Sequence, residues 1–318
     1  MPDVLRQIYK TILQSQRILL VTHQNPDGDA LACLSIMVEV LTDLQKDHVA
    51  YCCDKPSNSL LFLPHMEKIT CELNDLASFD LIISLDCGSL SRTKLAEIIS
   101  QRNPQQIFVE IDHHPHIEDV SDIEARDPQA ASTTEILYDF LQVNNLTLNS
   151  NVANCILTGI VTDTGNFVYP TTSEKTITIA AEMLKAGARL PQILENTWRN
   201  KSLPAMKLWG IAMSRLQINV KYDIAFSILT LEDLADLEAT EDDIDGVAGF
   251  MGNLPQVKAI MLLRQIEPGL IKGSLRTCRP EVDVSKLAQR LGGGGHSKAA
   301  GFNIKGDLQK IAGQWQIV

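Results

Sequence analysis

Between Arg17 and about Ile111 the chain alternates short apolar runs rich in β-branched residues with longer stretches of helical periodicity. The predicted strands are Arg17–Thr22, Val49–Cys52, Leu81–Leu85 and Gln106–Ile111, and the predicted helices are Ala30–Leu44 and Ser91–Ser100. This alternation is typical of an α/β domain in which helices cover both faces of a parallel sheet. Because residues 30–41 are apolar almost all round, we expect the first helix to be buried against the sheet.

A run of helices follows, and the pattern changes around Asn200–Trp209. The predicted helices of this run are Ser132–Gln142, Ser150–Thr162, Ser173–Ala186 and one that begins at Pro191. Beyond the change we predict strands at Ile224–Leu229, Val257–Gln265, Leu270–Arg276 and Ala299–Ile304, and helices near Ile244–Met251 and Val284–Leu291. A chain of 318 residues favours two domains. We therefore predict a parallel-sheet domain over 1–195, a linker region over 196–215 and a smaller mixed α/β domain over 216–318, across a cleft.

Charge and composition narrow the class of partner. The 28 Lys and Arg residues against 39 Asp and Glu residues give a formal net charge of −11. This charge argues against duplex DNA and membranes as partners, although a few cations beside metal ions can still hold a short phosphate-bearing ligand. No window approaches the ~18 apolar residues of a membrane span, the first residues lack a signal-peptide pattern, and the 7 Cys form no CxxC pair. We therefore expect a cytoplasmic protein with reduced thiols.

Acidic and imidazole side chains stand just beyond four of the apolar stretches. They are His23, Asp27 and Asp29 in the first segment, which also contains the amide of Asn25, Asp86 in the second, Asp112, His113 and His114 in the third, and Asp163 in the fourth. If the strands are parallel neighbours, their carboxyl ends bring these residues into one cleft, where α/β sheets usually carry ligands. So many acidic groups in one cleft repel one another unless divalent cations lie between them. The sequence therefore predicts a multinuclear metal site.

Each segment taken alone also has an ordinary structural interpretation. Asn25 to Asp29 can be a turn that caps the next helix, Asp86 can end a strand, and Asp163 can cap a turn. The adjacent pair His113 and His114 after an acidic residue is harder to explain by packing. One metal site accounts for all four segments at once, with Asp27 and Asp29 directed to two different cations and Asp86 shared by both.

This mixture of carboxylates and imidazoles suits Mn²⁺, Mg²⁺, Fe²⁺ or Co²⁺ better than Zn²⁺. Two such ions about 3.5–4 Å apart can clamp an in-line phosphoryl displacement and lower the pKa of a bridging water. The predicted chemistry is phosphoester hydrolysis.

A second signal lies near the carboxyl terminus, where four consecutive Gly (292–295) precede His296 and Lys298. Backbone amides without Cβ atoms can approach and cradle an anion. Arg276 ends a predicted strand and can offer a bidentate guanidinium to phosphate. The alternative is a purely structural glycine loop.

With these residues in place, the chain resembles the DHH phosphoesterases that carry a DHH-associated carboxy-terminal domain, and within them the bacterial nanoRNase and pAp (phosphoadenosine-phosphate) phosphatase branch. The motifs are His-x-Asn-Pro-Asp-Gly-Asp-Ala, Leu-Asp-Cys-Gly, Ile-Asp-His-His, Thr-Asp-Thr-Gly-x-Phe and Gly-Gly-Gly-His-x-x-Ala-Ala-Gly, in order from His23 to Gly301. Together they are very specific, and they cover nearly the whole chain.

The resemblance implies a role for each site residue. One Mn²⁺ would be bound by His23, Asp27 and Asp86, and the second by Asp29, Asp86, His113 and Asp163. Asn25 and His114 would orient the attacking water or contact the scissile phosphate, beside Asp86 and His113 in the catalytic set. The nucleotide would be bound by Arg276, Gly293, Gly294, Gly295 and His296. Asp112 would support His113 without binding a metal directly.

We accordingly predict an Mn²⁺-dependent phosphohydrolase, with Mg²⁺ or Co²⁺ as substitutes. It would degrade short single-stranded oligoribonucleotides to 5′-mononucleotides and dephosphorylate pAp to AMP, by attack of a metal-bridging hydroxide. The nearest alternative is a phosphodiesterase for cyclic di-AMP or its linear form pApA. A pyrophosphatase or polyphosphatase and a non-catalytic nucleotide sensor are further alternatives. The oligomeric state is left open, with a homodimer as one option.

Overall fold

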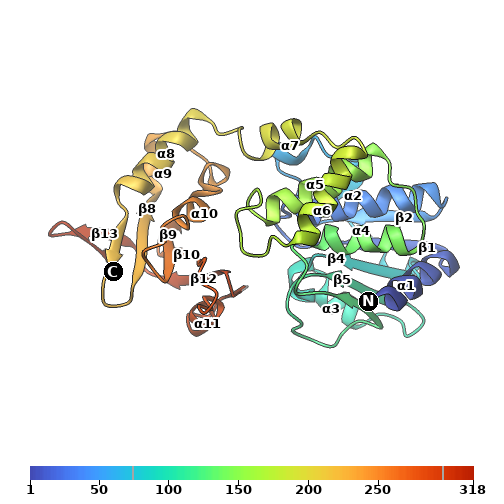
Figure 1. Cartoon of the computed structure of the whole chain (residues 1–318). Helices are drawn as coiled ribbons and strands as arrows, with labels where there is room; N and C mark the ends of the chain where they lie inside the picture. The colour runs from blue at the N-terminus through green and yellow to red at the C-terminus, as the bar shows by residue number, and fades with distance from the viewer. Residues whose placement is uncertain (74, 296) are drawn as a thin grey trace. The chain divides into compact units, whose positions relative to one another are not determined.

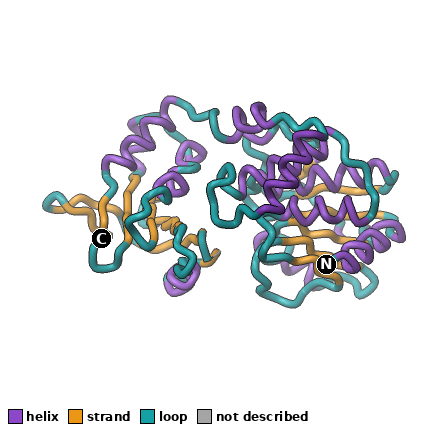
Figure 2. Tube along the Cα trace, viewed as in Figure 1, coloured by secondary structure: helices purple, strands orange, loops and turns teal. Residues whose placement is uncertain are grey.

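The computed structural model describes residues 1–73, 75–295 and 297–318, which form two compact units, Met1–Asn200 and Lys201–Val318 (Figure 1). Each unit contains its own sheet and its own helices, as the colouring by secondary structure shows (Figure 2). The range 196–215, for which we predicted a linker, contains helix α8 (Leu203–Ser214), and Leu208 and Ala212 of this helix are buried in the core of the second unit. The described residues include no helix of the length and apolarity that crossing a membrane requires.

The first unit is built on a six-stranded sheet in the order β3-β2-β1-β4-β5-β6, and every pair in it is parallel. Its strands are β1 (Arg17–Val21), β2 (Asp47–Tyr51), β3 (Ile69–Thr70), β4 (Leu81–Leu85), β5 (Ile107–Asp112) and β6 (Ile123–Arg126). The central strand β4 is buried along its whole length, which explains why four of its five residues are apolar.

Helices and short 3-10 turns cover both faces of this sheet. They are α1 (Pro2–Gln14), α2 (Gly28–Asp43), α3 (Ala96–Ser100), α4 (Thr133–Val143), α5 (Ser150–Asp163), α6 (Glu174–Lys185), α7 (Leu190–Thr197), η1 (Asn58–Leu60), η2 (Met66–Lys68), η3 (Leu76–Ser78) and η4 (Leu90–Thr93). The large core lies on the face of α2, α4 and α5, and α2 is buried almost all round, as its sequence predicted. A smaller core with Leu90 and Ile99 lies on the other face. The α/β prediction for this unit is confirmed.

Three local features differ from the sequence-based prediction. The helix predicted over Ser91–Ser100 is divided, because Lys94 has a left-handed backbone (φ 61°) between η4 and α3. Helix α1 and the short edge strands β3 and β6 were not predicted. Edge strands of two and four residues are too short to produce a clear alternating pattern.

The second unit is a mixed sheet in the order β11-β12-β10-β9-β8-β7, in which only β8 and β9 pair in parallel. Its strands are β7 (Gln217–Asn219), β8 (Ile224–Leu229), β9 (Ala259–Glu267), β10 (Leu270–Arg276), β11 (Gly294–Gly295) and β12 (Ala299–Lys305), followed by the hairpin β13 (Leu308–Ile311) and β14 (Gln314–Ile317). Its other elements are α8, α9 (Leu231–Asp236), η5 (Glu241–Ile244), α10 (Val247–Met251) and α11 (Ser285–Arg290). Separate cores on the two faces include Leu208 and Val247 on one and Ala288 and Phe302 on the other. The smaller mixed α/β unit is therefore confirmed.

Candidate metal centre

The predicted metal ligands gather where the order of the first sheet reverses. Strand β1 lies between β2, which follows it in the chain, and β4, so the carboxyl ends of β1 and β4 flank the topological switch point. His23 stands just after β1, Asp86 directly follows β4, and His113 directly follows β5. The fold thus brings His23 close to His113, which is 90 positions further along the chain.

One donor group consists of His23, Asp27 and Asp86, which each offer one atom within 4.8 Å of the others. Nε2 of His23 lies 3.7 Å from an oxygen of Asp27 and 3.8 Å from an oxygen of Asp86. The other ring nitrogen, Nδ1, lies 2.8 Å from the carbonyl of Gln24. Because a carbonyl can only accept, Nδ1 carries the proton and Nε2 presents its lone pair. This buried Nε2 has no hydrogen-bond partner among the described residues, as expected for a nitrogen that coordinates a metal.

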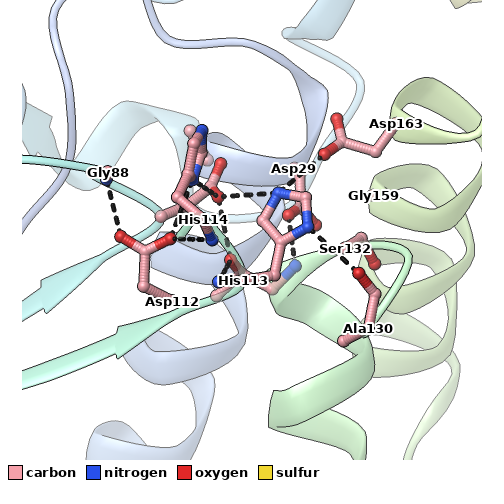
Figure 3. Close-up of polar contacts among 12 residues, drawn as sticks. Asp29, Gly88, Asp112, His113, His114, Ala130, Ser132, Gly159 and Asp163 are labelled. Atoms are coloured by element: carbon pink, nitrogen blue, oxygen red, sulfur yellow. Dashed lines mark hydrogen bonds and ion pairs between the residues drawn. The ribbon is translucent and has the colours of Figure 1, made fainter. Parts of the chain in front are cut away.

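A second donor group consists of Asp29, His113 and Asp163 (Figure 3). Nε2 of His113 lies 3.2 Å from an oxygen of Asp163 and 3.5 Å from an oxygen of Asp86. The Nδ1 proton of His113 is directed to the carbonyl of Ala130 at 3.2 Å, so Nε2 is the ring nitrogen that faces Asp163 and Asp86. Since Asp86 contacts a histidine of each group, it stands between the two.

The amino terminus of α4 holds Asp29 in place. The backbone amides of Thr133 and Thr134 donate to the two Asp29 oxygens at 2.6 and 3.1 Å. The hydroxyl of Thr133 also donates to Asp86 at 2.8 Å, so one residue positions carboxylates of both donor groups. Gly159 of α5 makes room for this arrangement, because a Cβ atom there would lie 2.2 Å from an Asp29 oxygen.

Asp86 and Asn25 both have left-handed backbones, with φ of 60° and 50°. Asp and Asn are the non-glycine residues that tolerate this region best. At Asp86 this conformation ends β4 and lets the carboxylate lie between the two histidines. The backbone amide of Asn25 donates to Asp54 at 2.7 Å, which fixes the turn before Asp27.

Asp112 contacts His114, and its expected support of His113 stays a prediction. One Asp112 oxygen lies 2.8 Å from both the backbone amide and Nδ1 of His114, and the other accepts from the amide of Gly88 at 2.6 Å. Burial disfavours the charged form of Asp112, but the hydrogen bond and the charge of His114 outweigh it and hold the pKa of Asp112 below its ordinary value. The carboxylate therefore orients the His114 ring, whose Nδ1 lies 3.5 Å from Asp86.

Arg126, the last residue of β6, contacts both His114 and Asp112. Its side chain is 7% exposed and donates to the carbonyl of His114 at 3.0 Å. It also lies 3.5 Å from Asp112 and 3.6 Å from Glu110, and it bonds Glu124. Nothing in the sequence pattern distinguished Arg126, because it lies on a four-residue edge strand.

We expect Arg126→Met to lower kcat about 10- to 100-fold while KM changes less than threefold, because the substitution releases His114 without touching the ligand site. The fold should also lose stability, since Glu110 and Asp112 would lack their buried cation. The double variant Arg126→Met with Glu110→Gln separates the two effects. It should regain part of the lost melting temperature and keep the low kcat; recovery of kcat together with stability would show that Arg126 acts on folding alone.

Burial and the neighbouring carboxylates disfavour the ionisation of Asp29, Asp86 and Asp163, whereas at Asp27 the contact with His23 outweighs burial and holds the pKa below its ordinary value. Burial and then the charge of Asp163 raise the pKa of Asp29 to about 7. Burial, followed by the charges of Asp29 and Asp27, raises the pKa of Asp86 well above its ordinary value. A divalent cation would remove this repulsion, and the donor set of carboxylate oxygens and imidazole nitrogens suits Mn²⁺ or a similar ion. The residues therefore fit a metal pair.

These shifts predict the pH dependence of the metal-free protein. A carboxyl whose pKa is raised on folding binds more protons in the folded state, so its stabilising effect is complete below about pH 4 and is lost as pH rises through about 7. For Asp29 the shift from 3.8 to about 7 corresponds to at most about 4 kcal/mol. We therefore expect chelator-treated protein to melt at progressively lower temperature from pH 5 to 8, and Mn²⁺ to flatten that dependence. A metal-free melting temperature that rises over this interval would contradict the crowded-carboxylate description.

In the second unit, Arg276 and the glycine run flank strand β12. Arg276 ends β10 and pairs with Ala299, while Gly294 and Gly295 form β11 and pair with Gly301 and Ala300. Gly294 and Gly295 thus form an edge strand of the sheet. Two glycines of the run have a steric reason, since a Cβ atom would lie 2.0 Å from the carbonyl oxygen of Gly301 at Gly293 and 2.6 Å from that of Ala299 at Gly295, whereas at Gly294 it would meet nothing within 4 Å. Our prediction for His296 lies outside the described residues.

The sequence-based set omitted the residues that hold the ligands: Thr133, Thr134, Gly159 and Arg126. A weak signal existed for the two threonines, because Ser132 caps α4 and a helix amino terminus favours a carboxylate. For Gly159 the only signal was a glycine inside a helical pattern, which often marks close packing.

Comparisons with known proteins agree with this geometry. Residues 17–160 match the model of the DHH family, N-terminal domain, and residues 222–314 match the DHHA1 domain. The bifunctional oligoribonuclease and PAP phosphatase NrnA of Thermus thermophilus is 28% identical over 292 residues, which cover 91% of this chain and 84% of the relative. The protein of the same name from Bacillus subtilis is 26% identical over 302 residues, with 94% and 92% covered.

A solved structure shares the whole architecture. The crystal structure of an exopolyphosphatase-related protein from Bacteroides fragilis superposes with a TM-score of 0.85 at 25% identity, and the match covers 95% of this chain and 91% of that one. The chain thus combines a DHH domain with a DHHA1 domain, in the order the motifs predicted.

Proposed function

We propose that the protein is an Mn²⁺-dependent hydrolase of phosphate esters that degrades short oligoribonucleotides to 5′-mononucleotides and dephosphorylates pAp to AMP. The observation that carries the proposal is the pair of donor groups on either side of Asp86, with His23 Nε2 buried and lacking a hydrogen-bond partner among the described residues. The similarity to NrnA proteins over more than nine-tenths of the chain supports the choice of substrate class.

The first donor group would hold one cation through His23, Asp27 and Asp86. The second would hold another through Asp29, His113 and Asp163, with Asp86 shared between them. When bound, such cations supply positive charge to the phosphate oxygens and lower the pKa of the attacking water. Mg²⁺ or Co²⁺ would be substitutes.

The remaining residues of the centre would orient water and substrate. His114 holds a proton at Nδ1 toward Asp112, which leaves Nε2 as the ring nitrogen that can exchange a proton with water or contact a phosphate oxygen. Asn25, in the turn before Asp27, would contact the scissile phosphate.

The second unit would hold the rest of the nucleotide. Arg276 would bind a phosphate through its guanidinium, and the amides of Gly293, Gly294 and Gly295 would cradle an anion. Gly294 and Gly295 form β11, which β12 separates from the strand that ends at Arg276. We assign metal binding to Met1–Asn200 and substrate binding to Lys201–Val318. The net charge of −11 favours short substrates over long single strands and duplex DNA, because long polymers require an extended basic surface.

A substrate panel tests the proposal. Purified, metal-stripped protein would be supplied with Mn²⁺, Mg²⁺ or Co²⁺ and then with pAp, di- to pentaribonucleotides, pApA, cyclic di-AMP, pyrophosphate and polyphosphate. We expect phosphate from pAp and 5′-mononucleotides from the oligoribonucleotides, both strictly metal-dependent. Preferred turnover of cyclic di-AMP or polyphosphate would reassign the substrate, and nucleotide binding without turnover of any member would favour a sensor.

Arg276→Ala serves as the second arm of this experiment. We expect KM for pAp to rise about tenfold or more with kcat changed less than threefold, because a phosphate contact made equally in ground and transition state affects binding alone. A loss confined to kcat would contradict a role for Arg276 in substrate binding.

A further inference from the structure

Arg92, in the 3-10 turn η4, lies beside the candidate metal centre in the first unit. Its Nη1 donates to the carbonyl of Cys87 at 3.1 Å, and Cys87 directly follows Asp86. Its own backbone carbonyl accepts from the amide of Gln24 at 2.7 Å, and Gln24 directly follows His23. Arg92 is therefore fixed at both ends to segments that carry proposed metal ligands.

The guanidinium of Arg92 is a near neighbour of the His114 ring. A Cβ atom on Gly88 would lie 3.1 Å from Nη1 of Arg92 and 3.1 Å from Cδ2 of His114, so the two side chains flank Gly88. The amide of Gly88 donates to Asp112 at 2.6 Å, beside His114 (Figure 3). The absence of a side chain at Gly88 leaves room between a guanidinium and an imidazole, two groups that can both donate to a phosphate oxygen.

The charge of Arg92 is directed at this centre. Arg126 of the same unit pairs with carboxylates, whereas Arg92 forms no ion pair with any described residue. Its bond to Cys87 uses one of the five N–H donors of a guanidinium. Burial raises the pKa of Asp27, but the contact with His23 outweighs it, and the charge of Arg92 lowers that pKa further. The side chain thus brings a positive charge and spare donors to the first donor group.

The two proposed substrates differ in the charge of the phosphate that is cleaved. The phosphate that leaves pAp is a monoester, which carries about −1.5 to −2 charges at pH 7. The phosphate between two nucleotides of an oligoribonucleotide is a diester with a single negative charge. A cation supplied by the protein therefore contributes more to the binding of the monoester than to that of the diester.

We propose that Arg92 binds the phosphate that is cleaved, beside His114, and favours the monoester of pAp over the diester of an oligoribonucleotide. The inference rests on the proposed function and names the residue that sets the balance between its two activities. The bond to Cys87 orients the guanidinium, and the remaining N–H groups donate to a phosphate oxygen. If Arg92 only fixed the turn after β4, its loss would affect both substrates equally.

Arg92→Gln tests the assignment, because its amide can still donate to the Cys87 carbonyl while the charge is lost. We expect kcat/KM for pAp to fall about 10²-fold and that for a tetraribonucleotide to fall less than tenfold, both with Mn²⁺. Mn²⁺ should bind at least as tightly in calorimetry, since a neighbouring cation is removed. Arg92→Lys keeps the charge and should keep the ratio of the two activities within about threefold of wild type.

Arg6→Gln on the exposed surface of α1 is the matched control and should leave both activities within twofold. Equal losses of Arg92→Gln on both substrates, a larger loss on the tetraribonucleotide, or no loss would overturn the assignment, while pAp turnover by the wild type still supports the proposed function. Mn²⁺ affinity that falls in step with activity would also overturn it. Failure of the wild type on both substrates would instead contradict the proposed function, and the assignment with it.

Discussion

Asp86→Asn should lower kcat by at least about 10³-fold and abolish the rise in melting temperature on addition of Mn²⁺. Asp86 is the carboxylate that reaches both His23 and His113, so its loss removes a ligand from each donor group. Asparagine is the suitable replacement because it also tolerates the left-handed backbone at this position (φ 60°). The fold should therefore survive.

Stability measurements separate lost chemistry from lost folding. In the metal-free state at pH 7.5 Asp86→Asn should melt at the wild-type temperature or higher, since the amide replaces a carboxyl group whose ionisation is disfavoured by burial and by the charges of Asp29 and Asp27. Asp3→Asn on the exposed surface of α1 is the control and should leave activity within twofold. Asp86→Asn activity within tenfold of wild type in metal-replete buffer would contradict a shared ligand at this position.

Gly159→Ala is expected to have the second-largest effect, although Gly159 carries no chemistry. Its Cβ atom would lie 2.2 Å from an Asp29 oxygen and 2.3 Å from the Thr134 hydroxyl, so the Asp29 carboxylate must move. Overpacking of this kind costs about 1–3 kcal/mol of stability. Displacement of a ligand should lower kcat about 10²-fold or more and weaken Mn²⁺ binding in calorimetry.

Gly210→Ala is the matched control for this prediction. Gly210 is also a helical glycine, in α8, but a Cβ atom there meets nothing within 4 Å. Alanine should stabilise that helix by up to about 1 kcal/mol and leave activity unchanged. Full activity of Gly159→Ala, with unaltered metal affinity, would mean that Asp29 is not held as the structure places it.

The sequence predicted those features of the fold that follow from local patterns. Short apolar runs and the polar residues after them located His23, Asp86 and His113 at the ends of parallel strands, because strand ends of such sheets meet at one edge. Helix α1 was predictable in the same way, since Leu5, Ile8 and Ile12 have helical spacing and are buried.

Such local patterns could not predict contacts between segments that are far apart in the sequence. The amides that hold Asp29 belong to Thr133 and Thr134, and the choice of His114 as the partner of Asp112 depends on side-chain orientation. Lys272 likewise faces Arg264 and Asn303 only because three strands pair in one particular register, which no single strand encodes.

The most direct measurement is the anomalous scattering of Mn²⁺ in crystals of the wild-type protein. The account predicts two peaks about 3.5–4 Å apart. One should lie among His23, Asp27 and Asp86, and the other among Asp29, His113 and Asp163. Bound Mn²⁺ that lies away from these side chains, or no Mn²⁺ at this sheet edge in crystals of active protein, would contradict it.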